Sequence, residues 1–265
     1  MARRTLLISA LLMALAGGCA SWRKTPALPV RNSIVLDQLV IYSDFPLPQH
    51  HRLLQELTTQ RSALVTKLGL PTSDEPIHVY LFGTPEQFRK FMGAHYPELP
   101  ERRAFFVESD TRLMVYAYWG DRVAEDLRHE VAHGYLHSVI NRLPLWLDEG
   151  LAEYFEVSRG QRGLNKPHVH ELAAAQKKGW KPDLERLEQL RSPGDMTQND
   201  YAESWAWVHF MLEGSPENQA LLRSHLQAIR KGERTEPLSS RLGRLHADYE
   251  RALLTHVAGL EESLR

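Results

Sequence analysis

The sequence H-E-V-A-H at residues 129–133 constrains the fold of this chain more than any other feature. On a helix, residues four apart lie on one face, so His129 and His133 can present two imidazoles to one metal ion. Glu130 lies beside that face, where a carboxylate can take a proton from a water molecule that the metal activates. A catalytic zinc needs three protein ligands and one open position. The motif therefore predicts a metal-binding helix and a third ligand elsewhere in the chain.

Chance is a poor explanation of this motif, because a chain with 13 His in 265 residues is expected to contain only about 0.05 matches by accident. The alternative is an ordinary buried helix whose histidines bond to neighbouring groups. Asp121 is an expected N-cap, and apolar residues at positions 124, 127, 131, 135 and 139 form a stripe behind it. Polar side chains on a buried helix need partners, since unpaired burial is costly, and a metal supplies one.

The third ligand has two candidates. His137 is two helical turns, about 12 Å, from His129, so one ion cannot bind both of them together with His133. We expect His137 to support a ligand or to pack. Glu149 is the better candidate, in the segment W-L-D-E-G-L-A-E-Y at residues 146–154. That segment predicts an amphipathic helix with acids at positions 149, 153 and 156 on one face, for which a solvated acidic surface is the alternative.

The two motifs together resemble the signature of the gluzincins, the clan of thermolysin-like peptidases and large zinc aminopeptidases. H-E-x-x-H followed by W-L-x-E-G-x-A-x-Y is especially similar to the peptidase-MA-like domains of bacterial lipoproteins. The resemblance implies a zincin-like α+β fold, Zn²⁺ bound by His129, His133 and Glu149, and Glu130 as general base. It also implies that Glu153 orients the first histidine through its second ring nitrogen. The metzincin form is excluded, because positions 136 and 139 hold Leu and Val rather than Gly and His.

A third segment, residues 201–213, looks like the aminopeptidase stretch Y-x-K-G-x-A-x-x-x-x-L-E. The likeness implies that the Tyr201 hydroxyl hydrogen-bonds the oxyanion that forms when water attacks the carbonyl. The alternative is a tyrosine that starts a core helix, with His209 or another C-terminal histidine as the electrophile. The aminopeptidase G-x-M-E-N segment, which grips a free substrate N-terminus, is absent upstream of His129. We therefore expect an endopeptidase.

The function expected from these motifs is a zinc metallopeptidase, a hydrolase that acts on a peptide or protein substrate. One alternative is a non-catalytic zincin-scaffold lipoprotein that binds a partner or assists envelope assembly, and another is a zinc hydrolase of a non-peptide bond. The intact Glu130 argues against the first, because a structural zinc has no use for a general base. Nucleic-acid binding is not expected, because the chain without residues 1–18 has 30 basic and 33 acidic residues, a net charge of −3.

Residues 1–18 have the pattern of a secretory signal peptide, with Arg3 and Arg4, an apolar run from Leu6 to Leu15 and small residues before Cys19. The run is shorter than the roughly 20 residues that span a bilayer. Small residues before the only cysteine resemble a bacterial lipobox, which implies that Cys19 is lipidated. With Ala next in the sequence, the expected location is the cell envelope, in the outer membrane facing the periplasm. Ordinary signal-peptidase cleavage is the alternative.

The remaining pattern predicts an α+β fold. Strand character covers residues 34–42, 76–82, 103–108 and 112–118, helical periodicity covers 49–68, and Thr84 with Pro85 starts a helix that runs to Met92. From Asp121 onward the chain is almost entirely helical in pattern. Residues 113–118 are expected either at a sheet edge that pairs with the substrate backbone or in the sheet core.

The expected domain organisation follows from these elements. Residues 1–18 are the signal peptide, and residues 19–33 are the lipidated cysteine and a Pro-containing tether. Residues 34–141 form an α+β lobe that ends in the motif helix. Residues 142–265 form a helical lobe that carries the third ligand, and the cleft is expected between the two lobes. The last helices, from Glu217 to Leu264, have ordinary amphipathic spacing that suits either core or docking surface.

Overall fold

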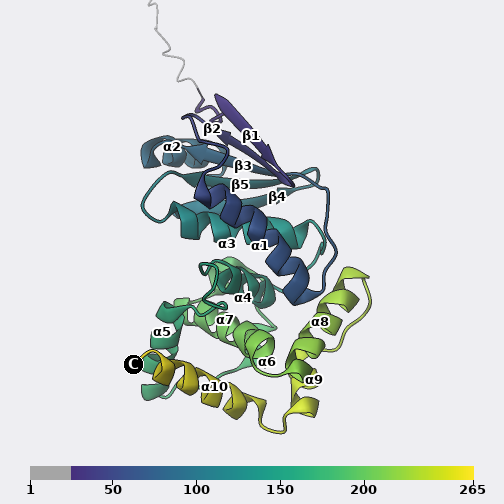
Figure 1. The fold of residues 1–265 in the computed structure, drawn as a ribbon. Helices are drawn as coiled ribbons and strands as arrows, with labels where there is room; N and C mark the ends of the chain where they lie inside the picture. Colours follow the sequence, from purple (N-terminus) through teal and green to yellow (C-terminus); the bar gives the residue numbers. More distant parts are fainter. Residues whose placement is uncertain (1–24) are drawn as a thin grey trace, which may run out of the picture.

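The computed structural model describes residues 25–265 and contains a five-stranded sheet followed by a group of helices (Figure 1). The strands are β1 Asn32–Leu36, β2 Leu39–Ser43, β3 Ile77–Phe82, β4 Ala104–Ser109 and β5 Arg112–Tyr118. Their order in the sheet is β1-β2-β3-β5-β4. The inner strands β2, β3 and β5 are parallel, and the two edge strands are antiparallel to their neighbours. The signal peptide and Cys19 predicted from the sequence lie outside the described residues.

The structure corrects one strand prediction and decides between two alternatives for another strand. The single strand expected over residues 34–42 is a hairpin, because Leu36 pairs with Leu39 across a turn in which Asp37 has a φ of 49°. Asp tolerates this left-handed conformation better than most residues. Of the two positions expected for residues 113–118, the sheet core is confirmed and the sheet edge is wrong, because β5 pairs with β3 on one side and β4 on the other. The edge strand on this side is β4.

Three helices cover the sheet. They are α1 Arg52–Leu68, α2 Pro85–His95 and α3 Val123–His137. In Figure 1, α2 lies on one face of the sheet, and α1 and α3 lie on the other. The start of α2 is confirmed, since the Thr84 side chain accepts a hydrogen bond from the Gln87 amide. The expected Asp121 cap of α3 is wrong, because Arg122 takes the N-cap position without a side-chain bond.

Helices make up the rest of the described chain. They are α4 Leu145–Phe155, α5 Lys166–Lys177, α6 Leu184–Leu187, α7 Gln198–Glu213, α8 Pro216–Arg230, α9 Leu238–Leu245 and α10 Tyr249–Ser263, with a 3₁₀ turn at Pro193–Asp195. The central helix is α7, which a Thr197–Asp200 capping box starts and whose residues 202–212 are all buried. It packs closely on α4 at Gly150, where a Cβ atom would lie 2.5 Å from the Ser204 carbonyl oxygen. None of the helices in residues 25–265 has the length and apolar character needed to cross a membrane.

One hydrophobic core joins the sheet to the helices. It runs from Leu39 in the sheet through Leu127 and Val131 of α3 to Trp205 of α7. The helix that carries the H-E-x-x-H motif therefore lies between the two halves of the molecule and is packed by both. The expected α+β fold with a helical C-terminal part is confirmed, and Leu222 and Leu226 of α8 belong to the same core.

Candidate metal centre

The H-E-x-x-H helix and the next helix bring three expected ligands together. His129 and His133 lie one turn apart on α3, and Glu149 lies in the first half of α4. The two Nε2 atoms are 3.2 Å apart, and Glu149 Oε2 is 3.5 Å from the Nε2 of His129 and 3.7 Å from that of His133. These three atoms converge on one point, so the cluster could hold a metal ion.

The spacing of these atoms fits a tetrahedral ion. Ligands 2.0–2.1 Å from a tetrahedral zinc are about 3.4 Å apart. The observed separations of 3.2, 3.5 and 3.7 Å lie close to that value. Glu149 Oε2 is moreover buried and has no hydrogen-bond partner within residues 25–265. A buried, unpaired carboxylate oxygen is costly, and a cation at this point would compensate it.

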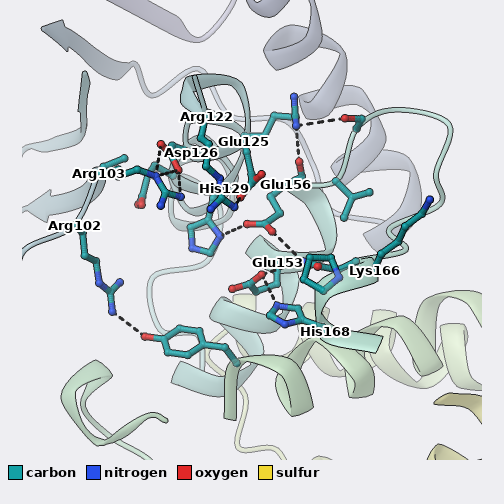
Figure 2. A pocket seen from close by; sticks show the side chains of 18 of the residues that line it. Arg102, Arg103, Arg122, Glu125, Asp126, His129, Glu153, Glu156, Lys166 and His168 are labelled. Atoms are coloured by element: carbon teal, nitrogen blue, oxygen red, sulfur yellow. Dashed lines mark hydrogen bonds and ion pairs between the residues drawn. The ribbon is translucent and has the colours of Figure 1, made fainter. Parts of the chain in front are cut away.

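The second ring nitrogen of His129 is held by Glu156, not by Glu153 as predicted. His129 Nδ1 is 3.0 Å from Glu156 Oε2, while Glu153 Oε2 is 2.7 Å from Nε2 of His168 (Figure 2). Both acids lie on the expected face of α4, but the C-cap residue Glu156 is the one opposite His129. Asn165 Nδ2 joins the two carboxylates, at 3.2 Å from Glu153 and 2.9 Å from Glu156. The imidazole of His129 is therefore held by a network that reaches α5.

A parallel chain of contacts supports His133. Its Nδ1 is 3.0 Å from Asp148 Oδ1, and the other Asp148 oxygen is 2.9 Å from His137 Nε2. His137 Nδ1 is in turn 2.7 Å from Glu108 Oε2 on the edge strand β4. Burial lowers the pKa of His137, but Asp148 and Glu108 outweigh it and raise that pKa to about 9. His137 thus contacts the carboxylate of Asp148 that meets His133, as expected if His137 supports a ligand.

Glu130 lies next to the ligand cluster and lines a cleft of about 760 Å³. Burial raises the pKa of its carboxyl, and the imidazoles of His129 and His133 act in the opposite direction. The cleft is lined from both halves of the molecule. Arg102 and Tyr118 come from the sheet half, whereas α4, α5 and α7 contribute the other wall.

Tyr201 lines the same cleft near the first residues of α7. Its hydroxyl accepts a hydrogen bond of 3.0 Å from Arg102 Nη2. The other expected electrophile, His209, is buried in the helical core instead. There its Nδ1 is 2.8 Å from His256 Nε2, and burial together with His256 lowers the pKa of His209 to about 3. Of the two, only Tyr201 has access to the cleft.

Three functional candidates were missed by sequence reasoning. Helix periodicity could have indicated Glu156, because it lies on the acidic face of α4 together with Glu149. The indication for Asp148 was weaker, since it only directly precedes Glu149. No sequence pattern indicated Arg102, because it lies in a loop and contacts Tyr201, which is 99 positions away in the sequence.

Comparisons with known proteins match a family model and solved structures. A family model described as "Protein of unknown function (DUF1570)" matches residues 123–238, which include α3, α4 and α7. No curated protein matches the chain. Among solved structures, an M1 zinc metallopeptidase from Deinococcus radiodurans is similar, with 19% sequence identity and a TM-score of 0.39. The match covers 83% of this chain and 47% of the peptidase, so the chain spans about half the length of that enzyme.

Proposed function

We propose that this protein is a zinc-dependent metallopeptidase, with an endopeptidase as the expected mode. The observation that carries the proposal is the convergence of His129, His133 and Glu149 at tetrahedral spacing, with the carboxylate of Glu130 beside them. A site that only needed a structural ion would use four protein ligands, whereas this cluster offers three and borders a cleft.

The geometry supports a role for each of these residues. His129, His133 and Glu149 would hold the ion, which when bound would supply Lewis-acid activation of water and of a substrate carbonyl. Glu130 takes the proton from the attacking water and delivers it to the leaving amine. Tyr201 donates a hydrogen bond to the oxyanion that develops on the carbonyl. Glu156 and Asp148 keep the two imidazoles in the required orientation.

The substrate and location belong to the same proposal. The edge strand β4 begins at the cleft with Ala104 and could pair with an extended substrate backbone. This gives β4 the role that the sequence suggested for residues 113–118. The lipobox-like residues before Cys19 support a lipid anchor in the bacterial envelope, in the outer membrane and facing the periplasm.

The test of the proposed function is the metal content of the purified full-length chain. We expect about one zinc ion per chain, and loss of that ion in Glu149→Ala because a three-ligand site would lose one ligand. Glu86→Ala, a surface glutamate on α2, is the control and should keep its zinc. A wild-type chain that binds no zinc after addition of the metal would contradict the proposal and favour the non-catalytic scaffold.

Substitution of the carboxylate that holds His129 is expected to weaken zinc binding. In Glu156→Gln the charged acceptor of the His129 Nδ1–H becomes neutral, and the zinc affinity should fall by about 10- to 100-fold. Competition with a chelator measures this affinity. The matched variant Glu153→Gln removes an acid that contacts His168 instead, and its effect should be smaller. A larger loss of zinc affinity in Glu153→Gln than in Glu156→Gln would assign the orienting role to Glu153.

A further inference from the structure

Arg102 differs from the other arginines of the cleft in its partner. Arg103 forms a bidentate contact with Asp126, Arg122 pairs with Glu125, and Arg128 pairs with Glu56. These guanidinium groups meet carboxylates, which are their strongest partners. The guanidinium of Arg102 meets the neutral hydroxyl of Tyr201. An arginine that points at a neutral group beside a reaction centre calls for a functional explanation.

The direction of this hydrogen bond has a chemical consequence. A guanidinium group has donors only, so the phenol oxygen must be the acceptor. The single O–H of Tyr201 is then not used by Arg102 and remains available to donate to another group. A cation that donates to the phenol oxygen also makes that O–H a stronger donor. The contact therefore leaves Tyr201 able to donate to an oxygen in the cleft.

The position of the pair suits this role. Burial raises the pKa of Tyr201 and Glu149 adds to that effect, while the hydrogen bond from Arg102 lowers the pKa. The positive charge of Arg102 also interacts with Glu149 and Glu130, so it lies close to the site of reaction. Tyr201 is fixed to the helical half by α7, and Arg102 precedes β4 in the sheet half. Their contact holds the hydroxyl from the opposite wall of the cleft (Figure 2).

We propose that Arg102 is a positioning residue for hydrolysis, which holds the Tyr201 hydroxyl as a hydrogen-bond donor towards the oxyanion. This inference rests on the proposed function and extends it to a residue outside the sequence motifs. Arg102 itself acts through Tyr201, and loss of the guanidinium affects the rate of the chemical step rather than substrate binding.

The kinetic test is a double-mutant cycle on a peptide that the wild-type chain cleaves. Arg102→Gln should lower kcat by about 10- to 100-fold with little change in KM, less than the roughly 100- to 1000-fold loss expected when the oxyanion donor itself is removed. Arg102→Lys should restore part of kcat. In a Tyr201→Phe background, Arg102→Gln should cause no further loss, because the group it positions is gone. If Arg102→Gln lowered kcat by the same factor with and without the Tyr201 hydroxyl, the proposal would be overturned. An increase in KM alone would assign Arg102 to substrate binding instead.

A measurement without catalysis separates this inference from the proposed function. With tyrosine labelled at ¹³Cζ, the NMR signal that disappears in Tyr201→Phe identifies Tyr201. Arg102→Gln should shift this signal, and Arg122→Gln, which breaks a different arginine contact of the cleft, should leave it in place. An unshifted Tyr201 signal in Arg102→Gln would overturn the inference whatever the activity. A shifted signal in a chain that binds zinc but cleaves no peptide would confirm the contact and contradict the proposed function.

Discussion

Replacing Glu130 by Gln is expected to lower kcat for peptide hydrolysis by roughly 100- to 10,000-fold, the usual contribution of a general base. The amide of Gln has nearly the shape of the carboxyl but cannot take up a proton from the attacking water. Because Glu130 is not one of the three convergent groups, the variant should still contain about one zinc ion per chain. The measurements are the rate of cleavage of a peptide library and the zinc content of the same preparation.

The control for this experiment is Glu86→Gln on α2, away from the cleft lining. Glu86 forms an exposed pair with Arg89, and its loss should change neither rate nor zinc content. Full activity in Glu130→Gln would remove Glu130 from the mechanism. A variant that is inactive because it has lost its zinc would show that Glu130 supports the metal centre instead.

Substituting Gly150 by Ala is expected to destabilise the protein by about 3 kcal/mol or more, at the upper end of the cost of overpacking a core. The added Cβ would lie 2.5 Å from the Ser204 carbonyl oxygen and 2.9 Å from a methyl group of Val208. The nearest atom belongs to the backbone of α7, so a side-chain rotation cannot relieve the clash. Thermal unfolding measures the effect, and we expect Tm to fall by roughly 6–12 °C.

Gly93→Ala is the matched control, since it is also a glycine-to-alanine change within a helix. A Cβ atom at Gly93 meets nothing within 4 Å. The gain in helix propensity should raise stability there by up to about 1 kcal/mol. Equal Tm changes in the two variants would contradict the close approach of α4 and α7.

The local features of this protein could be predicted from its sequence. The H-E-x-x-H helix, the acidic face of α4 and the Pro85 start of α2 depend on residues only a few positions apart. Their side-chain periodicity and capping chemistry are determined by helix geometry alone. For the same reason, the convergence of His129 with His133 followed directly from their spacing.

The features that depend on tertiary packing could not be predicted in this way. The inner position of β5 results from pairing with β3 and β4, and strand order is not contained in the alternation of residues along one strand. The choice of Glu156 over Glu153 depends on how α4 lies against α3. Both acids share a helix face, so only the contact between the two helices decides which one meets His129.

The continuous core has a thermodynamic consequence for the metal centre. Hinge motion between two halves is the default when their interface is small and polar, but here one apolar cluster buries the motif helix between the sheet and α4. Movement of the two walls of the cleft against each other would expose that apolar cluster to water. The imidazoles and the carboxylates that hold them therefore lose their conformational entropy when the chain folds. That cost is not incurred again when a ligand binds. A preorganised cluster of this kind would retain more of its intrinsic affinity for a metal ion.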